Sequence, residues 1–187
     1  MSARKSGSSA GKFGAFFLGI LVTLVCLGAG AFLYLKLGRP PVAVSDPAFP
    51  MEAQAVHVPL GSRIAKEIKQ PPFGTSEDVF EAGAKIYRAD CAECHGTPGH
   101  ESPYAKYMYP RAPQLWKKHA HSGVVGVSDD EPGETYWKVS NGIRLTGMPS
   151  YQHILSDTQM WQVSLLLKNA DQVLPDPVQK ILTAPSK

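Results

Sequence analysis

The sequence predicts an all-α protein in which one N-terminal transmembrane helix precedes a small helical domain with long loops. Two observations support this fold class. Residues 13–35 form an apolar run without a charge, and later segments show apolar residues at helical spacing behind helix-start signals, with no strand-like alternation. We therefore expect a membrane part and a globular part within the 187 residues.

The N-terminal part is predicted to be a basic cytoplasmic tail, residues 1–12, and a transmembrane anchor, residues 13–35. A helix over this run would be about 34 Å long at about 1.5 Å per residue, enough for a hydrocarbon core of about 30 Å. Arg4, Lys5 and Lys12 precede the run. Positive residues of this kind stay in the cytoplasm. We therefore expect a single-pass protein in a bacterial cytoplasmic membrane, with a cytoplasmic N-terminus and a periplasmic globular part.

A cleaved signal peptide is the alternative to a retained anchor. Ala29-Gly30-Ala31 resembles a small-residue cleavage site. The apolar run is longer than the roughly 7–15 residues of a signal-peptide core, so its length favours retention.

Charge and cysteine content exclude two further classes of protein. The net charge of +3 comes from the membrane end, since the chain has 14 basic and 16 acidic residues from Asp46 onward. This slightly acidic part offers no basic surface for nucleic acid. Only Cys91 and Cys94 accompany Cys26, which lies in the apolar run, so a fold built on disulfides is also excluded.

Residues 36–73 are predicted to form a Pro-rich tether. RPPVAVSDPAFP should be extended and semi-stiff, and SRIAKEIKQ predicts one or two helical turns that end before Pro71. Alternatively, this segment lies on a partner subunit through Phe49, Met51 and Val56.

The globular domain is predicted to span residues 74–175 and to contain three helices. Capping residues place two helix starts, at Thr75-Ser76 and Ser156-Asp157, and the short helix between them covers 134–139. Prolines should end the last helix, and residues 176–187 are expected to be a frayed C-terminal tail. Because so much of the domain is loop, we expect something other than side chains to fill its core.

The segment CAECHG places Cys91, Cys94 and His95 at a spacing that serves three chemistries. Structural zinc needs four ligands, and no second pair has the required spacing. A thioredoxin-like dithiol needs strands around the motif, and an amphipathic helix precedes this one. The pattern C-x-x-C-H is typical of covalent haem attachment, with two thioether bonds and the histidine on the iron. The sequence thus predicts one covalently bound haem c.

The second axial position of the iron is predicted to belong to Met148, in the loop RLTGMPSY. Glycine before it permits close backbone approach and proline after it stiffens the exit, as a loop that holds a thioether requires. Met108, His153 or an open position are the alternatives. Arg144 is a candidate partner of a haem propionate, with a solvated loop residue as the alternative, and we expect Tyr151 to line the haem crevice.

These residues resemble the small monohaem class I cytochromes c over about residues 76–170. Gly83 and Tyr87 look like the glycine–aromatic pair of the family's first helix, and Trp161 and Leu165 look like their counterparts on its last helix. Pro113-Gln114-Leu115 resembles the Pro-x-Leu segment, which implies that the Pro113 carbonyl accepts the N–H of His95. A long segment separates His95 from Pro113, and Pro110 is the alternative proline.

The resemblance implies a membrane-anchored electron-transfer protein rather than an enzyme. Its expected partners are the membrane and redox proteins such as a quinol-oxidising complex, a terminal oxidase or a photosynthetic reaction centre. It could act as a carrier or as a fixed subunit of a respiratory or photosynthetic complex. The alternative from another class is a haem enzyme or gas sensor with an open sixth coordination position.

Overall fold

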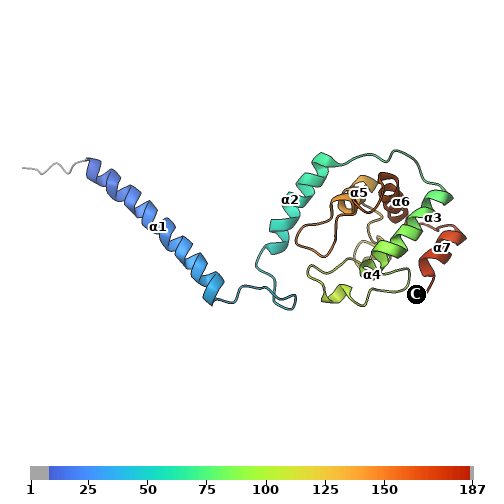
Figure 1. Ribbon diagram of the computed structural model, residues 1–187, viewed down its shortest axis with the longest axis horizontal. Coiled ribbons are helices and arrows are strands. Elements are labelled where there is room, and N and C mark those ends of the chain that lie inside the picture. Colours follow the sequence, from blue (N-terminus) through green and yellow to red (C-terminus); the bar gives the residue numbers. More distant parts are fainter. Residues whose placement is uncertain (1–8, 186–187) are drawn as a thin grey trace, which may run out of the picture. The chain divides into compact units, whose positions relative to one another are not determined.

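The computed structural model describes residues 9–185 and divides into two compact units, which meet between Ala48 and Phe49. Most of the predicted basic tail, including Arg4 and Lys5, lies outside the described residues. The first unit contains helix α1 (Ser9–Leu37), and the second contains every other helix (Figure 1). In the described range the chain forms no named strand, only two isolated β-bridges.

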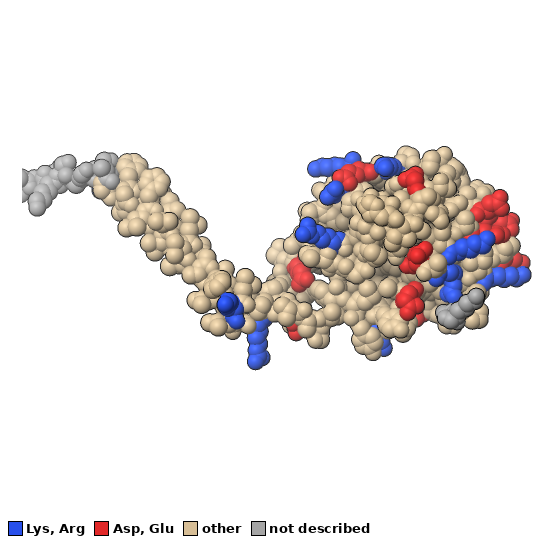
Figure 2. Space-filling view, viewed as in Figure 1, with Lys and Arg blue, Asp and Glu red and all other residues tan. Residues whose placement is uncertain are grey.

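Helix α1 is long and apolar enough to cross a membrane, with a mean hydropathy of 2.5 over its most apolar part. It extends beyond the predicted anchor at both ends, so that Lys12 and Lys36 lie inside the helix. Lysines at such ends place their charge in the interface while their stems stay in the apolar region. Figure 2 shows the uncharged surface along α1 and the basic side chains at its C-terminal end. The helix therefore fits single-pass anchoring.

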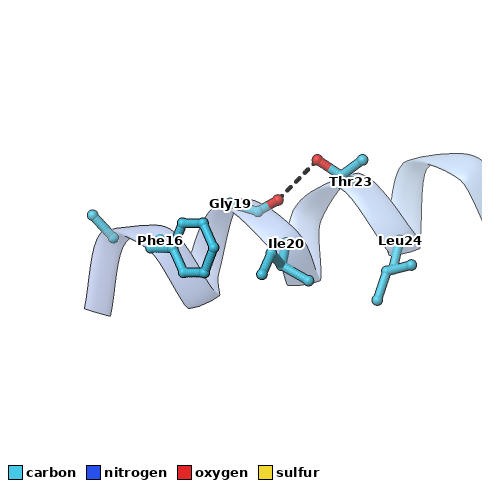
Figure 3. Close-up of a pocket in the computed structure, with 6 residues that line it drawn as sticks. Phe16, Gly19, Ile20, Thr23 and Leu24 are labelled. Carbon is cyan, nitrogen blue, oxygen red and sulfur yellow. Dashed lines mark hydrogen bonds between the residues drawn. The ribbon is translucent and has the colours of Figure 1, made fainter. Parts of the chain in front are cut away.

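One face of α1 carries a shallow groove, where small side chains alternate with large ones (Figure 3). Within it, the Thr23 hydroxyl donates to the Gly19 carbonyl at 2.9 Å, which satisfies the hydroxyl within the helix. Such faces let transmembrane helices approach closely. The lining residues are Ala15, Phe16, Gly19, Ile20, Thr23 and Leu24.

The second unit is built around the crossing of α3 (Glu77–Ile86) and α6 (Asp157–Lys168). A Cβ on Gly83 would lie only 2.5 Å from the Gln162 carbonyl oxygen, so the crossing requires glycine at this position. Helix α5 (Pro132–Asn141) joins α6 through stacked Tyr136 and Trp161 rings, 4.1 Å apart. The predicted pairing of the first and last helices of a class I cytochrome c is thereby present.

The chain beyond residue 175 is ordered, which corrects the expectation of a frayed tail. Residues Asp176–Thr183 form α7, which packs on α3 and buries Val178 and Leu182 almost completely. The guanidinium of Arg88 also donates to the Ala184 carbonyl at 2.7 Å. Figure 1 shows α7 beside α3 at the end of the second unit. Only residues 186–187 of the predicted tail lie outside the described range.

Helix α2 (Glu52–Glu67) occupies the middle of the segment predicted to be a tether, where we expected one or two turns. It contacts α5 through the Trp137 indole, which donates to Glu67 at 2.7 Å, and Ile64 is buried beneath it. The Arg63 guanidinium lies 5.9 Å from the centre of the Trp137 ring. The second unit thus begins well before residue 74.

Candidate haem-binding site

The C-x-x-C-H motif lies on a helical path that continues α3 through a π-helical turn (Tyr87–Cys91) into α4 (Ala92–His95). Gly96 ends this path with φ +72°, and a Cβ there would lie 2.6 Å from Oε1 of Gln114. Because only glycine tolerates both the dihedral angle and the contact, the chain turns away directly after His95. Cys91, Cys94 and His95 are therefore displayed from one short helical segment.

His95 is held by the contact that the resemblance implied. Its Nδ1 lies 2.8 Å from the Pro113 carbonyl oxygen, which can only accept, so Nδ1 must carry the proton. Burial lowers the pKa of His95, against the opposing effect of this hydrogen bond. The ring is consequently neutral at pH 7 with its lone pair on Nε2, the form that binds a metal.

Gln114, between Pro113 and Leu115, ties the motif to the chain that follows it. Its Nε2 donates to the carbonyls of Cys94 (3.1 Å) and Ala112 (3.2 Å), and its Oε1 accepts from the Ser102 amide at 2.7 Å. No role for Gln114 was predicted from the sequence. In the sequence, a role for Gln114 is indicated only by its position within the Pro-x-Leu segment, since its hydrogen-bond partners lie up to 20 residues away.

Tyr87 fixes the same segment from the other side. Its hydroxyl donates to the Gly96 carbonyl at 2.7 Å, and its ring stands edge-on to Trp116 at 5.5 Å. Burial raises the pKa of Tyr87, so the hydroxyl remains a donor. Tyr87, which resembles the aromatic residue of the family's glycine–aromatic pair, thus secures the end of the haem motif.

The distal loop that carries Met148 is closed by local hydrogen bonds. The Met148 carbonyl accepts from Ile143 N at 3.2 Å, and the Met148 amide donates to the Thr146 hydroxyl at 3.1 Å. Gly142, with φ +67°, lies where a Cβ would be 2.9 Å from the Met148 carbonyl oxygen. Met148 is half-buried and packs against the hydrophobic core.

Tyr151 connects the distal loop to the haem motif. Its hydroxyl donates to the Asp90 carbonyl, next to Cys91, at 2.7 Å, and its amide donates to Val139 at 3.0 Å. Burial raises the pKa of Tyr151 to about 12, which keeps the hydroxyl protonated at physiological pH. The structure therefore brings Tyr151 to the motif, whereas Arg144 is exposed on the distal loop.

The cysteines have the properties of attachment points rather than of a redox pair or a zinc site. Both are unpaired, and burial raises the pKa of the Cys91 thiol to about 12, whereas reactive dithiols have lowered pKa values. Among the described residues, no three His, Cys, Asp or Glu side chains gather as metal ligands. Two adjacent thiols beside a neutral imidazole with a free Nε2 fit covalent haem with one axial histidine.

Comparison with known families agrees with this chemistry. Residues 78–165 match the family model described as Cytochrome C oxidase, cbb3-type, subunit III. The match covers most of α3 and of α6, together with the haem motif, Pro113 and the distal loop. No curated protein matches the chain. The helical fold, the motif and this match over residues 78–165 support a class I c-type cytochrome domain, and this family of electron carriers binds haem c covalently.

Proposed function

We propose that this protein is a membrane-anchored monohaem cytochrome that passes single electrons between membrane redox complexes. In this proposal Cys91 and Cys94 would hold the haem through thioether bonds, and His95 and Met148 would bind its iron. Helix α1 anchors the haem domain on the periplasmic side of a bacterial cytoplasmic membrane. The observation that carries the proposal is the contact between His95 Nδ1 and the Pro113 carbonyl, which leaves Nε2 free for iron.

The residues around the site hold the ligands in place, as electron transfer requires. Haem c supplies the one-electron iron couple, and a methionine ligand raises its potential. Pro113 orients the imidazole of His95, and Tyr151 ties the distal loop to the haem motif. A site held in this way changes little when its charge changes, so no side chain needs to react.

The assignment of Met148 is tested by replacing it with alanine in the full-length protein. We expect Met148→Ala to lose the sulfur-to-iron charge-transfer band and to lower the reduction potential. Met51→Ala is the matched control, since Met51 is 74% exposed and lies outside the distal loop. A Met148→Ala protein with the band and potential of the control would refute the assignment.

The proposed role as an electron carrier also predicts weak reactivity with carbon monoxide. With Met148 on the iron, the reduced protein should bind the gas slowly and incompletely. Rapid and complete binding by the native protein would favour the alternative of a haem enzyme or gas sensor with an open position.

Two observations favour the role of a fixed subunit in a larger complex over that of a freely moving carrier. The matched family is described as a subunit of an oxidase, and the groove on α1 suits close contact with another transmembrane helix (Figure 3). The partner in this proposal is a terminal oxidase. Co-purification at fixed stoichiometry after gentle solubilisation would support the subunit role, and recovery of the cytochrome alone would support the carrier role.

A further inference from the structure

The long segment between His95 and Pro113 is anchored to the haem motif at its first half. The Ser102 hydroxyl donates to the Glu93 carbonyl at 2.6 Å, and the Ser102 amide donates to Gln114. The same hydroxyl accepts from the amides of Tyr104 and Ala105 at 3.2 and 3.3 Å. Ser102 and Ala105 are both buried, so this half is part of the folded domain.

The second half of the segment reaches the distal loop through Met108. A Cβ built on Gly147 would lie 2.5 Å from Cε of Met108, so the Met108 side chain lies directly against the residue before Met148. Met108 is half-buried, whereas its neighbours Tyr107 and Tyr109 are 69% and 44% exposed. Met108 is therefore the side chain of this stretch that turns toward the domain.

The part of the distal loop that Met108 contacts is not hydrogen-bonded to the rest of the described domain. In the described chain, every hydrogen bond made by residues 144–148 stays within 143–148. Leu145 is 82% exposed with a positive φ of 63°, and Gly147 is exposed. Hydrogen bonds within a short loop shape it but do not hold it against the domain. Besides the packing of Met148 on the hydrophobic core, the side-chain contact between Met108 and Gly147 restrains this loop from outside.

We propose that residues 97–112 form a strap from the haem motif to the distal loop, and that Met108 is a positioning residue for Met148. The proposal rests on Met148 being the axial ligand. Met108 packs against Gly147, excludes water there and slows the opening in which Met148 leaves the iron. A flexible, polarizable thioether suits this contact, because it adapts to an irregular surface without requiring a polar partner.

The opening of the loop can be measured by the rate at which added imidazole binds to the ferric holoprotein, since imidazole enters only after Met148 leaves. Met108→Ala should raise this rate about tenfold, which corresponds to about 1.4 kcal/mol. Met108→Leu, which restores most of the volume, should return it close to the native rate. Tyr107→Ala is the matched control, since the exposed neighbouring side chain should not affect opening.

Gly147→Ala tests the same contact from the other side. The added methyl group would displace Met108 Cε, so Gly147→Ala alone should accelerate imidazole binding. In the Met108→Ala background the methyl group has room, so the second substitution should add little. This non-additivity is the signature of a direct contact. Gly147→Ala also provides the test if Met108→Ala does not assemble.

The outcomes separate this inference from the ligand assignment. If Met148→Ala loses the charge-transfer band but Met108→Ala binds imidazole no faster than Tyr107→Ala, the strap is refuted and the assignment stands. If Met108→Ala itself loses the band, Met108 is a ligand and the positioning role is refuted. If Met148→Ala keeps the band, the assignment fails, and the inference fails with it. Additive rates for Met108→Ala and Gly147→Ala would also overturn the proposed contact.

Discussion

Replacing Gln114 with alanine should destabilise the holoprotein by more than a surface glutamine substitution would. Gln114 makes three hydrogen bonds, to the Ser102 amide and to the Cys94 and Ala112 carbonyls. Alanine removes all three and leaves the Ser102 amide, in a buried residue, without its acceptor. The haem motif then loses a tie to the segment that follows it.

The size of the effect follows from these contacts. A hydrogen bond contributes about 0.5–1.5 kcal/mol net, and a buried donor left unpaired costs about 1–3 kcal/mol. Gln114 is half-buried, so water can replace part of the loss at the two carbonyls. We therefore expect a loss of about 2–3 kcal/mol, which in a domain of this size lowers Tm by roughly 5–10 °C.

The assay is thermal unfolding of the full-length holoprotein in detergent micelles, followed by Soret absorbance and far-ultraviolet circular dichroism. Gln54→Ala is the matched control, because Gln54 is exposed on α2. It removes the same side chain without disturbing the haem motif. If Gln114→Ala unfolds within about 2 °C of the control, the loss is below about 1 kcal/mol and the reasoning is wrong.

Two further predictions concern the helices around the site. Burial and the hydrogen bond to Asp157 raise the pKa of Tyr136 from its ordinary value of 10 to about 12, so its contribution to stability is present below pH 10 and is lost as pH rises to 12. Tyr136→Phe should make the fall in Tm between pH 10 and pH 12 smaller. If the fall in Tm is unchanged, ionisation of the Tyr136 hydroxyl does not contribute to it. Leu182 lies on α7 and is only 1% exposed. Leu182→Ala should lower the free energy of unfolding by about 2–5 kcal/mol, as measured by denaturant unfolding. Val173→Ala is the control, because Val173 is exposed. Equal free energies of unfolding for Leu182→Ala and Val173→Ala would mean that the packing of α7 does not stabilise the domain.

Local signals predicted the helix starts well. The Ser76 side chain accepts from Val79 N at 3.3 Å, and Ser156 forms a complete capping box with Gln159. Such caps involve residues three apart, so they are visible in the sequence. The motif C-x-x-C-H was equally visible, because covalent attachment fixes the spacing of its residues. The close crossing of α3 and α6 at Gly83 was predicted from the resemblance to class I cytochromes c and not from a local signal.

Tertiary contacts explain what the sequence did not predict. Pro175 and Pro177 were interpreted as the end of a helix. Instead, Pro175 directly precedes α7 and Pro177 lies in its first turn, a position that proline suits. Helix α2 contains Pro59 and depends on a hydrogen bond between Glu67 and Trp137, 70 residues apart. The role of Gln114 likewise depends on Ser102 and Cys94, which no short-range pattern connects to it.

The packing of α2 against α5 sets how far the haem can travel from the membrane. Between α1 and α2 the chain runs only over residues 38–51. Four of these 14 residues are prolines, so the connection is semi-stiff, and at about 3.1 Å per residue it reaches about 43 Å. A tether that ran to residue 73 would let the domain move much farther, so the ordering of α2 raises the effective concentration of the domain near the end of α1.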